Sequence, residues 1–438
     1  MEVVVTLEDE ISKKLNDDTV ARDENYNLGD FRSVVRIRAE AQARVLPILE
    51  RLTAKPDSFR RANKTNPEIS LENRWMRNEL FNVVLMHVDE DGLLALNKLQ
   101  GVRSVCENLV IRNPSCMTPS PKTTGIDQGN VNWGIQDLEI EKIWNAGFRG
   151  EGMRIGHLDS GVHGNHPDLK GKVDSFVSFS VYYEPIPSSP FETWIRAHGT
   201  QTAGVLVGGN SSESIIGVAP EAKLVSAVAL PNNVTSIFLC AQALAWIITQ
   251  HVDVVNISFG LWPGYDIRLD PYMNDLRNLG VLTVCAVGNY GIAGSVTPGH
   301  NKPSCSVGAY DRNHDLWDQS AGATLVLKDG AMIKKPNYVA PGVSVRTTSL
   351  APAASPVPIL EEVTGTSIAA PFVAAGAVLL KQFLKGSAKR LAPKSILGRL
   401  EKAIYYTCDR SHKKARNDPR YGVGFFKPFA AFQELQKG

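Results

Sequence analysis

Four short segments place an acid, an imidazole, an amide and a hydroxyl in one order along the chain. The segments IGHLDSGV, AHGTQTAG, VCAVGNYG and GTSIAAPF contribute Asp159, His198, Asn289 and Ser367. A histidine can take the proton of a serine hydroxyl, a carboxylate can hold that histidine in one tautomer, and an amide N–H can bind the resulting oxyanion. These residue types predict nucleophilic attack on a carbonyl carbon, followed by acyl transfer.

The segments with the acid and the amide are strand-like. The apolar run Met153–Leu158 ends directly before Asp159, and the run Val281–Val287 ends two residues before Asn289. Open α/β sheets bind their ligands at the carboxyl ends of their strands. We therefore expect the Asp159 carboxylate at this edge of a sheet.

The imidazole and the hydroxyl stand at predicted helix starts. His198 precedes the small, helix-compatible stretch Thr202–Val207, and Ser367 precedes an apolar run that is typical of a buried helix. Pro371 falls in the first turns of that run, where a missing N–H is tolerated best. A helix start at Ser367 would aim backbone N–H groups and the helix dipole at developing negative charge.

Each segment alone is weak support for catalysis. GTS and DSG are common turns, and a single histidine before glycine is more often structural than catalytic. The pattern GTSxAxP after an apolar strand is more specific. The four segments together, in this order, favour the catalytic interpretation over a chance match.

The chain resembles the subtilases, the subtilisin family of serine peptidases, from about residue 133 to about residue 432. Subtilisin carries its acid, histidine and serine in this order. Shorter matches to the family are NWGI at 132–135, GVAP at 217–220, YVAPG at 338–342 and YGVG at 421–424. The resemblance implies an α/β fold, namely a three-layer subtilisin-like domain with a mostly parallel sheet.

The resemblance also implies a role for each site residue. Ser367 would be the nucleophile, His198 the general base and acid, and Asp159 the group that orients His198. Asn289 and the Ser367 backbone N–H would form the oxyanion hole. An extended substrate would pair with the backbone of the strand run VVNISFG at 254–260. The expected substrate-binding residues are Ser258, Phe259, Gly260 and Gly288, and Phe259 and Trp262 are candidates to line the cleft.

Two positions depart from the family pattern. Many members carry a second histidine three residues after the catalytic one, and this chain has Gln201 there. We expect this change to alter packing rather than activity. The segment Tyr182–Phe191, rich in proline and serine, is expected to form a loop beside the site that shapes substrate access.

No cofactor and no metal are expected. Subtilisins often bind calcium in a loop before the GVAP turn, which here is residues 208–214. Asn210, Glu213 and Asp168 supply oxygen atoms, but the loop lacks the acidic pattern that a hard cation prefers. An ordinary solvated loop is the favoured interpretation.

The residues before the catalytic region predict a separate small domain. Residues 1–30 form an acidic segment with nine acids and three bases, and residues 113–130 form a linker rich in Pro, Ser and Thr. Between them, residues 31–112 alternate between strand and helix patterns, which predicts an α+β domain of the ferredoxin-like, split βαβ type. The expected elements are strands at Phe31–Ala39, Leu80–Val88 and Val102–Ile111, helices at Ala41–Leu52 and Asp89–Leu99, and a polar loop at Thr53–Arg77. The catalytic domain is then 131–438.

This first domain resembles a subtilase prodomain. The segment LALNKLQGVRSVCEN at 94–108 is similar to the end of subtilase propeptides. The resemblance implies a zymogen whose N-terminal domain docks on the catalytic domain and is removed by autocleavage between about residues 113 and 130. The alternative is a permanent accessory domain that recruits substrate or regulates access.

Composition is that of a globular enzyme. The chain has 438 residues, 43% of them apolar, and a formal net charge of +2, so no general basic bias points to nucleic acid. No basic segment followed by an apolar one opens the sequence, and we expect no stretch to approach the length of about 18 apolar residues that a membrane span needs. The six cysteines lack paired spacing, and Cys240 and Cys285 lie in apolar runs as core thiols do. These features predict a cytoplasmic location.

Three functions share this set of residues. The first is a serine endopeptidase that hydrolyses peptide bonds in peptide or protein substrates. The second is a subtilase that processes or ligates a dedicated peptide, because ligation needs the same catalytic groups. The third is a peptide-binding pseudoprotease, which the complete set of four residues disfavours.

Overall fold

The computed structural model describes residues 2–7, 75–78, 83–87, 90–100, 102–108, 110–112, 118–119, 131–180, 183–209, 215–261, 269–292, 294–326, 332–350, 360–387, 391–411 and 418–437. The chain divides into two compact units. One contains Met1–Val110 and Ser236–Ala245, and the other contains Ile111–Thr235 and Trp246–Gly438.

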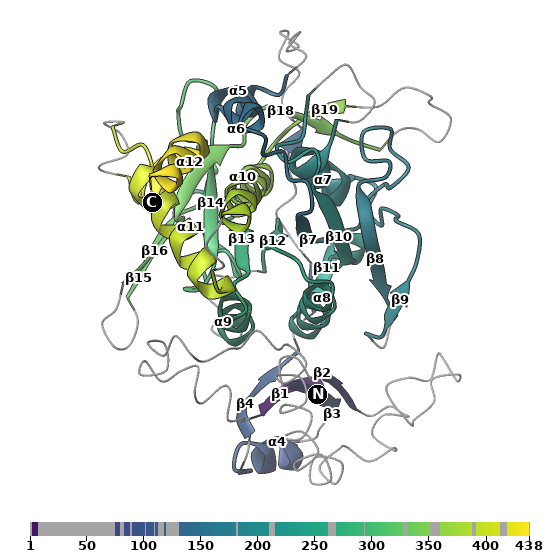
Figure 1. The fold of residues 1–438 in the computed structure, drawn as a ribbon. Coiled ribbons are helices and arrows are strands. Elements are labelled where there is room, and N and C mark those ends of the chain that lie inside the picture. The colour runs from purple at the N-terminus through teal and green to yellow at the C-terminus, as the bar shows by residue number, and fades with distance from the viewer. Residues whose placement is uncertain are drawn as a thin grey trace. The chain divides into compact units, whose positions relative to one another are not determined.

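The second unit is built on an eight-stranded sheet, which confirms the predicted α/β fold (Figure 1). The strand order is β17-β14-β13-β12-β7-β10-β8-β9, and every pair with a described register is parallel except β8 with β9. The strands are β7 (Arg154–Asp159), β8 (Val173–Phe179), β9 (Pro185–Pro187), β10 (Lys223–Val228), β12 (Val254–Ile257), β13 (Leu282–Ala286), β14 (Cys305–Tyr310) and β17 (Tyr338–Pro341).

Strand β7 lies where the strand order changes direction. After β7 the chain forms β8, β9 and β10 on one side, where β10 lies next to β7, and then β12, β13, β14 and β17 in outward order on the other side. Open α/β sheets bind ligands beyond the carboxyl ends of the strands at such a switch point. Asp159 is the last residue of β7, so the fold delivers its carboxylate to this place.

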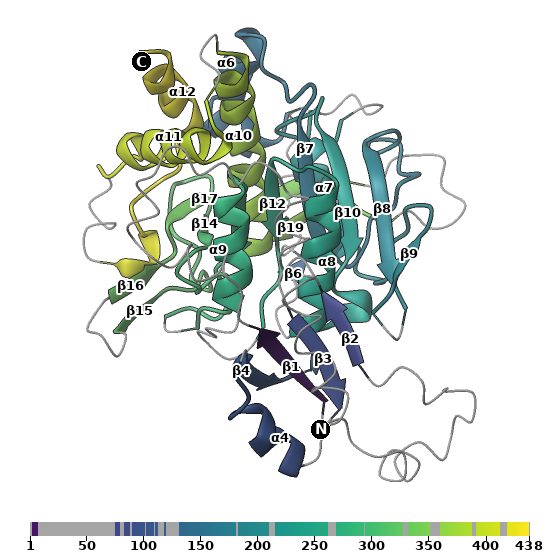
Figure 2. The same ribbon diagram turned by 60° about the horizontal axis from the view of Figure 1, so that its bottom comes forward.

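Helices cover both faces of this sheet. A Cβ atom added to Gly156 of β7 would lie 2.6 Å from Ile247, in the C-terminal half of α8 (Ile237–Thr249). The next residue, His157, faces the opposite way and contacts Thr202 of α7 (His198–Val207). Helix α9 (Asp270–Asn278) packs near β13, and α10 (Thr366–Gly386) lies behind the sheet in Figure 2. The predicted three-layer arrangement is therefore confirmed.

Helix α10 is the central helix of the core. It packs on β12, β13, β14 and β17 on one side and on α7, α11 and α12 on others. It is also long and apolar enough to cross a membrane, and 89% of its apolar window is buried inside the protein. The expectation that no stretch has this composition was wrong. Because the helix is surrounded by other elements, nearly every position must be apolar, and burial accounts for its composition.

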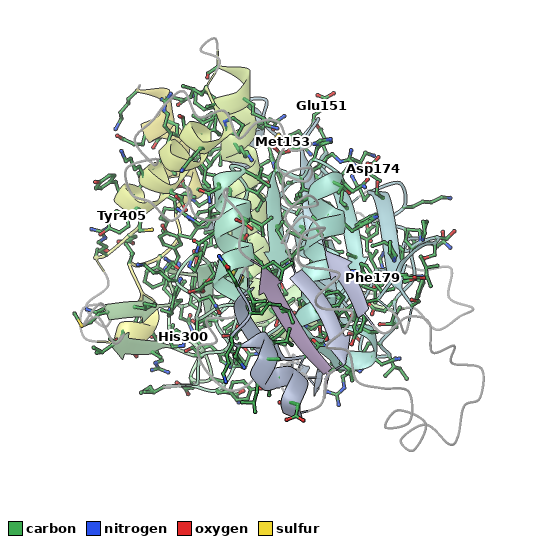
Figure 3. The ribbon with its side chains drawn as sticks, turned by 90° about the horizontal axis from the view of Figure 1, so that it is seen from below. Glu151, Met153, Asp174, Phe179, His300 and Tyr405 are labelled. Carbon is green, nitrogen blue, oxygen red and sulfur yellow. The ribbon has the colours of Figure 1, made fainter. Side chains whose placement is uncertain are left out.

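Shorter elements complete this unit. They are β6 (Thr118–Pro119), α5 (Trp133–Asp137), α6 (Ile140–Asn145), β11 (Val234–Ser236), β15 (Ala323–Val326), β16 (Met332–Lys335), β18 (Val345–Thr348), β19 (Leu360–Thr364), α11 (Pro393–Thr407) and α12 (Pro428–Gln436). Figure 3 shows the side chains around the sheet, with Asp174 and Phe179 marking the two ends of β8. Strand β9 lies inside the segment Tyr182–Phe191, which was expected to be a loop only.

The first unit contains a four-stranded antiparallel sheet of order β2-β3-β1-β4, with α4 (Glu90–Leu96) between β3 and β4 in sequence. Its strands are β1 (Glu2–Leu7), β2 (Trp75–Asn78), β3 (Val83–His87) and β4 (Val102–Glu107). Because β1 pairs with both β3 and β4, residues 2–7 belong to this domain, and the boundary placed at residue 30 is wrong. An acidic segment follows β1, which obscured this strand in the sequence.

Three other expectations concern this unit. The strand predicted at Leu80–Val88 is present as β3 (Val83–His87), and the helix predicted at Asp89–Leu99 is present as α4 (Glu90–Leu96). The single strand expected over Val102–Ile111 is two strands, β4 and β5 (Val110–Arg112), and the loop expected to end at Arg77 already contains the start of β2. The strand and helix predicted at 31–39 and 41–52 lie outside the described residues.

Candidate active site

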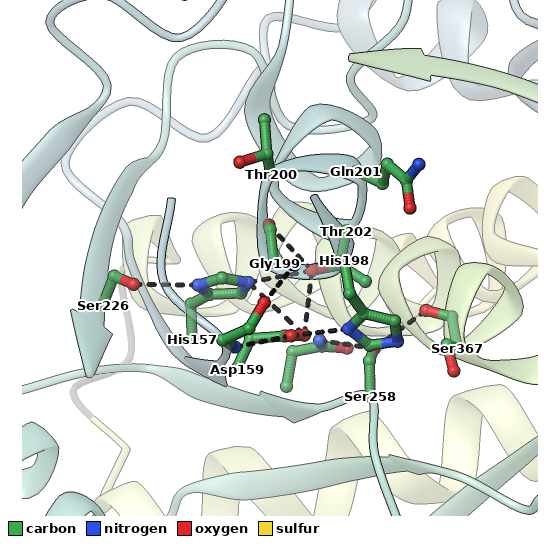
Figure 4. Close-up of polar contacts among 12 residues, drawn as sticks. His157, Asp159, His198, Gly199, Thr200, Gln201, Thr202, Ser226, Ser258 and Ser367 are labelled. Atoms are coloured by element: carbon green, nitrogen blue, oxygen red, sulfur yellow. Dashed lines mark hydrogen bonds and ion pairs between the residues drawn. The ribbon is translucent and has the colours of Figure 1, made fainter. Parts of the chain in front are cut away.

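The fold brings Asp159 and His198 into direct contact although 39 residues separate them in the sequence. Nδ1 of His198 lies 2.5 Å from Oδ1 of Asp159 (Figure 4). Asp159 ends β7, and His198 is the first residue of α7, which packs against that strand. Both side chains are buried. The contact holds the imidazole with Nδ1–H toward the carboxylate.

The pKa values of the pair are shifted in opposite directions. Burial opposes the charge on Asp159, but His198, its hydrogen bond and the Ser160 N–H together lower the pKa of the carboxyl below its ordinary value. Burial also opposes the charge on His198, and the nearby carboxylates of Asp159 and Glu192 outweigh it and raise the pKa of the imidazole. Each group thus stabilises the ionised form of the other.

The second nitrogen of His198 lies on the side of the imidazole where Ser367 is found (Figure 4). Among the described residues, Nε2 is buried and has no hydrogen-bond partner. Figure 4 draws Ser367 beside this edge of the imidazole. Ser367 is the second residue of α10, and its side chain is almost entirely buried. An imidazole nitrogen that lacks a partner here is available to a serine hydroxyl or a leaving group.

The backbone of Ser367 is supported by Asn256 of β12 and by Ser258, which follows directly after that strand. The Ser258 hydroxyl donates to the backbone carbonyl of Ser367 over 2.8 Å. Asn256 Nδ2 in turn donates to the Ser258 oxygen over 2.9 Å. Ser258, expected to bind substrate, therefore uses its side chain to support the start of α10.

The amide of Asn289 is anchored through its oxygen. Oδ1 of Asn289 accepts from the backbone N–H of Thr366 over 3.0 Å and from its hydroxyl over 2.7 Å. The Thr366 hydroxyl also accepts from the Gly288 N–H. Since the oxygen is occupied by these donors, the NH₂ group of Asn289 is the part of the amide left to bind another acceptor.

The other expected substrate-binding residues are placed by tight packing. Gly288 has φ +114°, a left-handed conformation that favours glycine. A Cβ on Gly260 would lie 2.0 Å from Val296, so no larger residue fits there. The Phe259 side chain is buried, so it does not line an open surface. Trp262 lies outside the described residues.

Glu192 is a site residue that the sequence did not reveal. Its carboxylate accepts from the backbone N–H and hydroxyl of Thr200, and from the Trp194 N–H. These contacts place a carboxylate at the N-terminus of α7, where the helix dipole favours negative charge. Burial is the main reason that the pKa of Glu192 is raised. A lone glutamate in a polar loop gives no sequence signal for this role.

Two threonines and a histidine were also missed. Thr366 anchors Asn289, while His157 and Thr202 contact the acid side of the site. His157 precedes Asp159 by two residues in one strand, and Thr202 follows His198 by four in one helix. Residues two apart in a strand, or four apart in a helix, lie on the same face. The spacing of His157 and Thr202 could therefore have predicted that they lie beside Asp159 and His198.

Gln201 has a defined place in the structure. Its Nε2 donates to Glu361 over 3.1 Å, and its backbone carbonyl accepts from Thr347. In the part of the chain that the structure describes, no three His, Cys, Asp or Glu side chains gather to hold a metal. Residues 210–214, most of the loop weighed for calcium, lie outside that part.

Comparison with known proteins agrees with this geometry. A family model described as the subtilase family matches residues 150–424. Subtilisin Savinase of Lederbergia lenta is 33% identical over 256 residues, which are 58% of this chain and 85% of that protein. An alkaline protease of Alkalihalobacillus alcalophilus is 33% identical over 256 residues, 58% of this chain and 60% of the relative. Subtilisin E of Bacillus subtilis (strain 168) is 27% identical over 257 residues, 57% and 61% of the two chains.

The matched residues contain all four segments singled out in the sequence and every strand of the large parallel sheet. The match covers more than half of the chain. The protein therefore belongs to the subtilase family and is a serine protease.

Proposed function

We propose that this subtilase cleaves peptide bonds through an acyl-enzyme on Ser367, with His198 as base and Asp159 as the group that orients it. The contact between His198 Nδ1 and Asp159 Oδ1 carries this proposal. It leaves Nε2 as the basic nitrogen, next to the helix that bears the serine. No other described contact competes for that nitrogen.

The path of the proton follows from this arrangement. The Ser367 oxygen attacks the scissile carbonyl carbon while His198 Nε2 takes the hydroxyl proton, and the imidazolium is stabilised by Asp159. The C–N bond then breaks as Nε2 returns the proton to the leaving amine. Water, deprotonated in the same way, attacks the ester carbonyl and releases Ser367.

The oxyanion would be bound by two donors. One is the Asn289 NH₂ group, whose orientation Thr366 sets, and the other is the Ser367 backbone N–H at the start of α10. Because these donors are held before the reaction begins, they need no reorganisation when the charge forms. The backbone of residues 258–260 is proposed to pair with the substrate on the other side of the cleft.

Self-processing is the second part of the proposal, and the pairing of strands β5 and β6 supports it. Strand β5 pairs with β11, and strand β6 pairs with β19, where Thr364 lies opposite Thr118. Thr364 is only three residues before Ser367. Five residues lie between Arg112 and Thr118, and an extended chain over the six steps from one to the other reaches about 20 Å. We therefore place the autocleavage site between Arg112 and Thr118, within the first part of the linker.

Replacing the nucleophile tests the reaction. Ser367→Ala should abolish hydrolysis of a peptide substrate and labelling by a fluorophosphonate, with the fold retained because the site is already packed. The loss measured for the equivalent change in subtilisin is about 10⁶-fold in kcat. Ser411→Ala, an exposed serine, is the matched control. Turnover by Ser367→Ala at the wild-type rate would contradict the mechanism, and joined rather than hydrolysed products from the wild type would identify a ligase.

The raised pKa of His198 predicts the acid limb of the pH profile. Only the neutral imidazole can accept a proton, so kcat/KM should fall as the pH decreases through this pKa. The midpoint should lie above 6.5, the ordinary value. Glu192→Gln should lower the midpoint because it removes a negative charge that raises the pKa, whereas Glu151→Gln on the surface should not. A rate that is constant from acid to neutral pH would contradict a histidine base.

The anchor of Asn289 should affect turnover. Asn289→Ala should lower kcat by about 10²–10³-fold, the magnitude known for subtilisin. Thr366→Val should lower kcat by about five- to tenfold, the equivalent of one hydrogen bond, because the amide loses an anchoring donor. Thr364→Val removes a hydroxyl that instead accepts from Ser344 N–H, and should leave kcat unchanged. Equal effects of both threonine changes would contradict an orienting role for Thr366.

Intact mass of purified protein tests self-processing. The wild type should lose between 112 and 117 N-terminal residues, and Ser367→Ala should keep all 438. A wild-type cut within residues 120–130 would contradict the cleavage position between Arg112 and Thr118, but it would still show self-processing. A full-length wild type that still reacts with a fluorophosphonate would show that the N-terminal domain is a permanent regulator.

A further inference from the structure

His157 is a buried histidine with no role in the mechanism above. It lies in β7 two residues before Asp159, and its side chain has no exposure to solvent. Both ring nitrogens are in contact with hydroxyls: Nδ1 lies 2.9 Å from Ser226 Oγ, and Nε2 lies 2.9 Å from Thr202 Oγ1. Ser226 is its direct neighbour on β10, so the sheet register sets one of these contacts.

Thr202 connects His157 to the catalytic acid. Its hydroxyl oxygen lies 3.1 Å from Oδ2 of Asp159, the carboxylate oxygen that does not hold His198. The same oxygen lies 3.0 Å from the carbonyl of Gly199. Four side chains therefore form a line from Ser226 through His157 and Thr202 to Asp159 (Figure 4).

The charge on Asp159 determines the direction of these hydrogen bonds. The Thr202 hydroxyl has one proton, and a bond to a carboxylate is stronger than one to a neutral carbonyl. Thr202 therefore donates to Oδ2, and its oxygen must accept the proton of His157 Nε2. His157 Nδ1 is then an acceptor, and the Ser226 hydroxyl donates to it.

This pattern requires a neutral His157, and the surroundings favour one. Burial is the first cause of its lowered pKa, and the positive charge on His198 acts in the same direction, against the attraction of Asp159. The groups that face it from β10 and α7 are the uncharged Ser226, Thr202 and Gly199. Glu192 acts on His198 and Asp159 from the loop before α7.

We propose that His157 and Thr202 are positioning residues, which hold the second oxygen of Asp159 and thereby set how strongly the first oxygen binds His198. This inference rests on the proposed role of Asp159 and His198. Donation to Oδ2 disperses the carboxylate charge and fixes the rotation of the carboxylate. Without it, Oδ1 becomes more basic and binds the Nδ1–H of His198 more tightly.

The test is the acid limb of kcat/KM in Thr202→Val, which removes the hydroxyl and keeps the side-chain shape. Its midpoint should rise by about 0.5–1 pH unit, because the imidazolium is better stabilised, and kcat should fall about three- to tenfold. Thr202→Ser keeps the hydroxyl and should restore the wild-type midpoint. Thr283→Val is the matched control, because Thr283 is buried in β13 and, among the described residues, its hydroxyl has no partner.

His157→Leu tests the residue that lies next to Thr202 in this line, on the side away from Asp159. It should raise the midpoint less than Thr202→Val, because the Thr202 hydroxyl still donates to Oδ2 but no longer accepts the His157 hydrogen bond that strengthens this donation. It should add no further shift in the Thr202→Val background, since His157 acts only through Thr202. Additive shifts would overturn this order of action. If His157→Leu does not fold, the pair Thr202→Val and Thr202→Ser decides the question alone.

A readout without turnover separates this inference from the proposed function. In the Ser367→Ala background, the proton NMR signal of His198 Nδ1–H should move downfield in Thr202→Val relative to Thr202→Ser. An unmoved signal together with an unchanged or lowered midpoint would overturn the inference and leave the mechanism intact. A wild type without hydrolysis or fluorophosphonate labelling would instead refute the proposed function.

Discussion

The buried contact between Asp159 and His198 is the interaction on which the rest of the site depends. Two charges removed from water are stable only when their attraction and added hydrogen bonds offset the loss of hydration. The structure supplies these bonds from Ser160 N–H and Thr202 on one side, and it adds Glu192 near the imidazole. The contact forms because the strand that ends at Asp159 lies at the switch point of the sheet and α7 begins beside it.

The proposed oxyanion-binding residues obey a different constraint, which is orientation rather than charge. Thr366 receives the Gly288 N–H and donates to Asn289, so one hydroxyl couples the end of β13 to the start of α10. On the opposite side, Asn256 and Ser258 support the Ser367 carbonyl from β12. The start of α10 is thus fixed from two neighbouring strands. The apolar body of that helix, buried between sheet and helices, makes the position rigid.

The sequence predicted the strands and helices that end or begin at the proposed catalytic residues, since their apolar runs and motif order are local features. It did less well where local signals were mixed. Strand β1 was hidden by the acids that follow it, and β9 by prolines within a segment that reads as a loop. The composition of α10 was judged short of a membrane span, although complete burial demands that apolarity. Glu192 could not be found, because a cap supplied from outside a helix has no fixed spacing from it.

By itself, the sequence determined the reaction class, because the chemistry needs four residue types whose order along the chain is specific to one family. The tertiary structure decided which atoms of these residues meet. It shows that one oxygen of Asp159 faces His198 while the other faces Thr202, and that Asn289 presents its NH₂ group because its oxygen is held. It also shows where β6 pairs beside the helix of Ser367. Such contacts join residues far apart in the chain, and only packing of the whole sheet and its helices determines them.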